Sequence, residues 1–170
     1  MNIHEELAAN EAAIERDKNK IAKWLQDRCK VGWTHFITLT FSKTDISEYA
    51  AQKALSDWHK WVSKKLYGNR SGKMIWMNSY LEKNKSDQFH YHLLIETDGS
   101  EKEQYIDSSN FKLLLKNTWK KLAVAGRSNL KDKNNWFQEI KSGTEAAVVN
   151  YSIKQYKSNN QILDVSNFTA

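Results

Sequence analysis

The sequence predicts an α+β fold with elements in the order β-α-β-β-α-β, the ferredoxin-like or split βαβ plan. Two observations predict it. Segments 33–42, 73–82 and 88–97 have the composition and alternation of strands, and segments 45–66 and 108–123 carry apolar residues at helical spacing. In this plan the first and third strands lie at the centre of an antiparallel sheet. Helices cover one face of the sheet, and we expect the other face to be open.

Composition indicates one domain over residues 1–170, with no linker. The net charge of +6 and the pI near 9.2 favour a polyanionic partner, although a well-solvated surface would explain the same charge. A single cysteine, Cys29, is compatible with a reducing cytosol. Because we find neither an apolar run of membrane-spanning length nor a signal-peptide pattern, we expect a cytoplasmic protein without a membrane partner.

The first half of the chain predicts a lead helix, a strand and a second helix. Charged and apolar residues alternate at near-helical spacing over about 3–28, ahead of a core that we place at about 33–157. The sequence WTHFITLTFS, residues 33–42, suits a strand because it is rich in β-branched and aromatic residues. Asp45 and Glu48 are spaced as a capping box, and Gly68 ends the helix that follows.

The second half predicts two paired strands, a helix, a short strand and a last helix. KNKSD is a hairpin-like connection, so the strands on either side of it are expected to be antiparallel neighbours. WFQEI, residues 136–140, is the fourth strand, after a polar loop. Ser142 and Glu145 are expected to cap a helix that runs to about Tyr156, and a polar tail follows over 158–170.

The third strand carries a His-x-His pair in the sequence QFHYHLLIET. Side chains alternate along a strand, so His90 and His92 project from one face, where they make half of a metal site. Two surface histidines on a half-buried strand would give the same pattern. The residues of opposite parity are apolar and suit a core: Phe89, Tyr91, Leu93 and Ile95.

The open face is expected to hold the third ligand and the contacts to nucleic acid. Glu82 ends the strand that pairs with the histidine strand, so it can reach the same ion, although it could also be a solvated turn carboxylate. Two imidazoles and a carboxylate suit Mn²⁺, Mg²⁺ or Zn²⁺ and leave positions for substrate oxygens. Trp76 and Tyr80 could stack on bases or be buried by the last helix. The residues expected to contact DNA are Thr38, Thr40, Trp76, Tyr80, Lys131 and Lys133.

The last helix carries a Tyr-x-x-Lys pair in the sequence VVNYSIKQY. Tyr151 and Lys154 project from nearly one side, with small Ala147 one turn earlier, whereas Tyr156 is expected to face elsewhere. A phenol is largely protonated at neutral pH, so a nucleophilic tyrosine needs positive charge nearby, which a divalent ion and a lysine can supply. Alone, the pair could be an ordinary surface pair.

Together, FITLTF, FHYHLLI and YSIK resemble, in this order, the three motifs of the HUH replication initiator endonucleases of rolling-circle plasmids, single-stranded DNA viruses and filamentous phages. The resemblance spans about residues 33–157. It implies that His90, His92 and Glu82 bind Mn²⁺ or Mg²⁺ on the open face of the sheet. It also implies that Tyr151 is the nucleophile and that Lys154 assists it.

The family resemblance implies a rolling-circle replication initiator that nicks and joins single-stranded DNA through a 5′-phosphotyrosine. Its partners would be origin DNA, alone or extruded as a hairpin, and the host's helicase and polymerase, since the sequence contains no G-x-x-x-x-G-K-[ST] motif. Three alternatives stay open: a single-tyrosine HUH transposase, a non-catalytic binder of single-stranded nucleic acid, and a phosphodiesterase that hydrolyses DNA without a covalent intermediate.

Overall fold

The computed structural model describes residues 3–29, 33–122, 130–131, 135–152 and 162–164. Its regular elements, in chain order, are α1 (Ile3–Cys29), β1 (His35–Thr40), α2 (Glu48–Tyr67), β2 (Trp76–Lys83), β3 (Phe89–Glu96), the 3-10 turn η1 (Glu103–Tyr105), α3 (Ser108–Lys120), β4 (Phe137–Glu139), α4 (Glu145–Ser152) and β5 (Ile162–Asp164).

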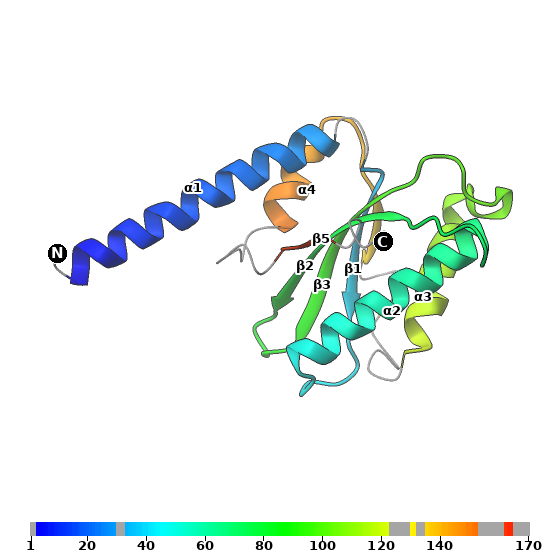
Figure 1. Ribbon diagram of the computed structural model, residues 1–170, viewed down its shortest axis with the longest axis horizontal. Helices are drawn as coiled ribbons and strands as arrows, with labels where there is room; N and C mark the ends of the chain where they lie inside the picture. The colour runs from blue at the N-terminus through cyan, green and yellow to red at the C-terminus, as the bar shows by residue number, and fades with distance from the viewer. Residues whose placement is uncertain (1–2, 30–32, 123–129, 132–134, 153–161, 165–170) are drawn as a thin grey trace.

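The strands form one antiparallel sheet in the order β4-β1-β3-β2-β5. Helices α2 and α3 lie together on one face, whereas α4 and the C-terminal part of α1 lie on the other (Figure 1). The first and third strands lie inside the sheet, between β4 and β2. The predicted split βαβ plan, with helices added at both ends, is therefore confirmed.

Three local predictions differ from the structure. Ser47, not Asp45, caps α2, because its backbone is extended and its hydroxyl accepts the Ala50 N–H at 3.1 Å. Thr144, not Ser142, stands at the start of α4, where its carbonyl accepts the Val148 N–H. Within the predicted polar tail, Ile162–Asp164 pairs with β2 as an edge strand. Three residues are too few to show a strand period, so the sequence did not indicate this strand.

The α2/α3 face of the sheet buries a continuous apolar core. Alternate residues of β1 and β3 point into it, among them Leu39 and Leu93, both fully buried. Trp58 of α2 lies fully buried beneath α3 and donates its indole N–H to the Leu115 carbonyl at 3.2 Å. Trp119 of α3 donates in the same way to the Thr40 carbonyl at 2.8 Å, which ties α3 to the end of β1. The predicted parity of the core strands is confirmed.

The second face of the sheet carries a smaller apolar cluster, which differs from the open face that we predicted. Phe36, Tyr80 and Leu94 project from that face and are buried against Leu25 of α1 and Val149 of α4, together with Trp33. These strand residues are large and apolar or aromatic, so burying them against α1 and α4 removes their surface from water. As a result, α4 lies on the sheet next to the two histidines.

Helix α1 extends away from the sheet at its N-terminal end (Figure 1), where Ile3 and Leu7 are exposed. Within the described residues, none of the helices combines the length and the apolar character that crossing a bilayer requires.

Candidate active site

Glu82, His90 and His92 converge at one point on the second face of the sheet. The Nε2 atoms of the two histidines are 3.2 Å apart. One carboxylate oxygen of Glu82, Oε2, lies 3.5 Å from Nε2 of His90 and 3.4 Å from Nε2 of His92. Three donor atoms from two strands thus form a small triangle, and the predicted metal group is confirmed as a spatial cluster.

The spacing of these donors fits a single divalent ion. Ligands held at about 2.1 Å from an ion lie roughly 3.0–3.4 Å from one another in octahedral or tetrahedral geometry. The three observed separations, 3.2, 3.4 and 3.5 Å, are close to that range. Two nitrogens and one oxygen leave coordination positions for substrate, as a catalytic site requires.

The strand register explains why these residues meet. Glu82 of β2 lies directly opposite His90 of β3, and Thr38 of β1 lies directly opposite His92. The short hairpin after β2 sets this register, with the Asn84 N–H donating to the Gln88 carbonyl at 2.9 Å and Asp87 in a left-handed conformation at φ 58°. The central position of β3 between β1 and β2 therefore brings ligands and their support together.

Thr38 orients one of the two imidazoles. Its Oγ1 lies 3.0 Å from Nδ1 of His92, so a neutral His92 that donates its Nδ1–H to Thr38 presents an unprotonated Nε2 to an ion. On the other side, the ring of Phe36 stacks on His92 with centroids 5.4 Å apart and planes inclined by 24°. These two contacts fix both the tautomer and the plane of the ring.

The site is largely closed to water on the protein side. His92 is 1% exposed and Glu82 is 6% exposed. Burying a carboxylate is costly unless a positive charge lies nearby, and a bound divalent ion would supply that charge. Burial and donor chemistry therefore agree with the distances. His92 lies beneath aromatic rings, and not on an open surface as the sequence had suggested.

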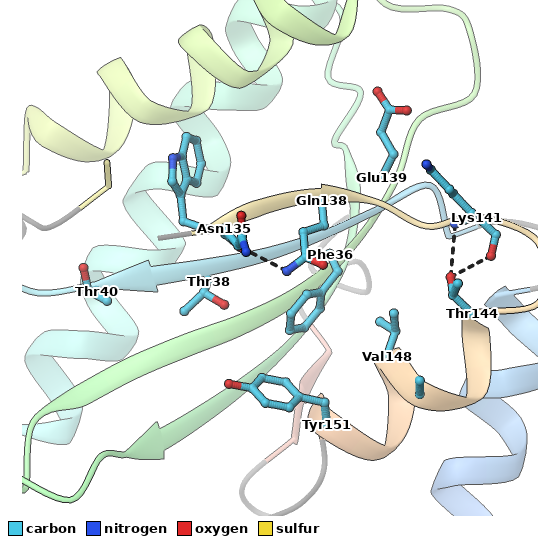
Figure 2. Close-up of a pocket in the computed structure, with 12 residues that line it drawn as sticks. Phe36, Thr38, Thr40, Asn135, Gln138, Glu139, Lys141, Thr144, Val148 and Tyr151 are labelled. Atoms are coloured by element: carbon cyan, nitrogen blue, oxygen red, sulfur yellow. Dashed lines mark hydrogen bonds between the residues drawn. The ribbon is translucent and has the colours of Figure 1, made fainter. Parts of the chain in front are cut away.

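Tyr151 lies next to this cluster. It belongs to the last turn of α4, it is 50% exposed, and its ring centroid is 5.0 Å from that of His92. Its ring also meets Phe36 edge-on at 5.9 Å. Figure 2 shows the ring projecting from α4 past Phe36 toward the strands. A half-exposed phenol beside a metal ligand is placed to meet a bound substrate.

A cavity of about 710 Å³ opens beside Tyr151, between β1, β4 and α4 (Figure 2). Thr38, Thr40 and Ala147 line it, so the small residue that we noted one turn before Tyr151 does face open space.

The other predicted site residues have different positions. Trp76 is 45% exposed on β2, whereas Tyr80 is 3% exposed within the α1/α4 cluster, as its alternative interpretation expected, and is not available for stacking on bases. Lys131 is exposed beside buried Leu130. The remaining predicted residues, Lys133 and Lys154, lie outside the described residues, as does Tyr156.

Two residues near the site were not assigned their observed contacts from the sequence. Thr38 was expected to contact DNA, but it hydrogen-bonds His92, and Phe36 was given no role although it packs on both His92 and Tyr151. The parity of β1 placed both on the correct face. Only the β1–β3 register could have revealed their partners.

Comparison with known families gives one match. Residues 34–158 match the family model described as replication-associated protein, of the ORF2 type. This match covers well over half of the chain, so the protein belongs to this replication-associated protein family, in agreement with the resemblance to replication initiators. A search of curated proteins found no significant match.

Proposed function

We propose that this protein initiates rolling-circle replication by nicking and rejoining single-stranded DNA through a covalent bond to Tyr151. The observation that carries the proposal is the placement of a half-exposed tyrosine ring 5.0 Å from His92, within a triangle of donors suited to a divalent ion. Membership in a replication-associated family supports the same chemistry. Replication of a plasmid or phage would place this activity in the cytoplasm.

Glu82, His90 and His92 would hold the ion, and Mn²⁺ or Mg²⁺ suits the mixed nitrogen and oxygen donors. When bound, the ion supplies positive charge that polarises the scissile phosphate and favours the phenolate. Thr38 keeps His92 in the tautomer that presents Nε2. The aromatic cover of Phe36 excludes water from the back of the site.

The chemical step would transfer the phosphate to Tyr151. The Tyr151 oxygen attacks the phosphorus in line, the bond from phosphorus to the 3′-oxygen breaks, and a proton equivalent to the one lost by the phenol is taken up by the departing 3′-oxygen. The products are a 5′-phosphotyrosine and a free 3′-hydroxyl that can prime replication. The energy of the phosphodiester is retained, so the reverse reaction can rejoin strands without a nucleotide cofactor. We assign the assisting cation to Lys154.

The DNA would lie across the second face, near Thr40 and Trp76, with Lys131 and Lys133 contacting phosphates. The substrate would be origin DNA, single-stranded or extruded as a hairpin. The host's helicase and polymerase would then extend the 3′-hydroxyl.

A direct test is to incubate the protein with random single-stranded DNA and Mn²⁺, then look for a covalent adduct on a denaturing gel. We expect an adduct that EDTA prevents reversibly. Cleaved DNA without any adduct would indicate a hydrolytic phosphodiesterase. Binding without cleavage would indicate a non-catalytic binder. A replication initiator differs from a transposase in the site it uses, so cloned sequencing of the cut sites should return a replication origin and not transposon ends.

A further inference from the structure

The cavity beside Tyr151 is large enough for more than water. Its volume of about 710 Å³ falls within the range of roughly 300–1,000 Å³ that is usual for small-molecule sites. Tyr151 forms part of its wall, together with Phe36 and Trp136. Whatever occupies this cavity therefore lies against the proposed nucleophile. Figure 2 shows these groups around a common space between α4 and the strands.

The chemistry of the lining favours an uncharged base over a phosphate. Of the residues that line the cavity, only Glu139 and Lys141 are charged, and their charges are opposite. A phosphate site would need an excess of cations or of free N–H donors. Aromatic rings, small apolar side chains, hydroxyls and carboxamides make up the remainder of the wall. Rings of this kind stack on nucleobases regardless of sequence.

Gln138 supplies an oriented hydrogen-bonding group at this wall. It lies opposite Phe36 in the β1–β4 register, so its side chain is on the face that carries the site. Its Nε2 donates to the Asn135 carbonyl at 3.0 Å, and Asn135 holds a left-handed turn at φ 47° that directs this carbonyl (Figure 2). The carboxamide is thereby held with an oxygen acceptor and a second N–H for other partners. One acceptor and one donor together can pair with the edge of a base.

Thr40 gives a second polar contact further along β1. It lines the same cavity, and its Oγ1 is buried with no hydrogen-bond partner among the described residues. Thr40 lies opposite His90 in the sheet, which connects the cavity to the metal ligands. A buried hydroxyl without a partner costs free energy, and a ligand in the cavity would remove that cost.

From these observations we propose that the cavity receives an unpaired nucleobase next to the scissile phosphate, and that Gln138 determines which base is preferred there. This inference rests on the proposed function. It adds a base-selecting residue to a site whose other contacts position the strand. The lysines set overall affinity, whereas Gln138 would change the preference at one position of the sequence.

The test compares the wild type, Gln138→Ala and Gln138→Glu with the control Gln52→Ala, which changes a glutamine of α2 on the opposite side of the sheet. Each protein selects from a random single-stranded library in two ways. Binding in EDTA needs no cleavage, and adduct formation with Mn²⁺ reports the reaction. The selected DNA is sequenced, and base preference is compared at each position.

We expect the wild type and Gln52→Ala to prefer one base at a position adjacent to the cut. Gln138→Ala should lose that preference by about tenfold, and Gln138→Glu should change it, because the donor is lost. Unchanged preferences at every position in both selections would overturn the inference. If no protein forms an adduct, the proposed function fails. The selection in EDTA still decides whether Gln138 selects a base.

Discussion

The two faces of the sheet use the same strands for different purposes. On the α2/α3 face, β1 and β3 contribute only large apolar side chains, sealed beneath Trp58 and Trp119. On the α1/α4 face, the alternate residues of those strands are Thr38, His90 and His92, and they lie beneath α4 with little exposure. Alternation along a strand thus separates folding stability from chemistry, so changes on one face should have little effect on the property supplied by the other.

The largest expected effect is on the chemical face. His90→Ala removes one of three donors, so we expect metal-dependent cleavage to fall to the background level. The free energy of unfolding in EDTA should change by no more than about 1 kcal/mol, because His90 lies outside both apolar clusters. Cleavage assays and urea denaturation measure the two quantities. Full cleavage by the wild type in EDTA would contradict the metal assignment.

The opposite pattern is expected on the core face. Leu55 of α2 is fully buried, so Leu55→Ala should lower the free energy of unfolding by about 2–5 kcal/mol. In the fraction that remains folded at low temperature, Mn²⁺ affinity should match that of the wild type. Calorimetry with Mn²⁺ checks this, together with urea denaturation. A large loss of affinity in the folded protein would show that the two faces are coupled.

Thr38 tests the support of the metal ligands. Thr38→Val keeps the shape but removes the oxygen that lies 3.0 Å from Nδ1 of His92. We expect Mn²⁺ affinity to fall by about 10–100-fold, as is usual when a group that orients a ligand is lost. Thr38→Ser, which keeps the oxygen, is the matched control and should retain most of the affinity. Equal affinity in all three proteins would mean that Thr38 does not orient His92.

The smallest effect concerns buried histidines away from the site. Burial holds the pKa of His59 below its ordinary value of 6.5, and the pKa of His35 is lowered by burial too, against the opposing pull of Glu139 and Glu101. The unfolded chain then binds protons that the folded protein does not, so the free energy of unfolding falls as the pH drops below about 6.5. The slope is at most about 1.4 kcal/mol per pH unit for each histidine.

Urea denaturation from pH 7.5 to pH 5 in EDTA measures this slope. His59→Gln should reduce it, since glutamine can still donate to the Ile75 carbonyl that His59 Nε2 contacts at 2.7 Å. His4→Gln, at an exposed position of α1, should leave the slope unchanged. An identical slope in the His59 variant would show that this histidine does not contribute.

The sequence predicted the parts of the fold that follow from period and register. The alternation around His90 and the short connection after Glu82 were enough to predict that the two residues meet. The cover over His92 could not be predicted, because it depends on how α1 and α4 pack across strands that are distant in sequence. The parity of Phe36 was visible, but its ring contacts require the position of α4.

The edge strand and the cavity were missed for a related reason. Ile162–Asp164 forms a strand because β2 has a free edge at that point, and not because of a pattern of its own. The cavity lies between β1, β4 and α4, and no short motif spans these three segments.

The central claim is that Tyr151 becomes bonded to DNA next to the Glu82, His90 and His92 cluster. The most direct measurement is peptide mapping of the adduct by mass spectrometry after digestion with a protease and a nuclease. We predict a nucleotide attached to Tyr151, absent in EDTA and in Tyr151→Phe, with DNA binding retained by that variant. Tyr156→Phe should still form the adduct. Attachment at Tyr156, or an adduct that persists in Tyr151→Phe, would contradict the account.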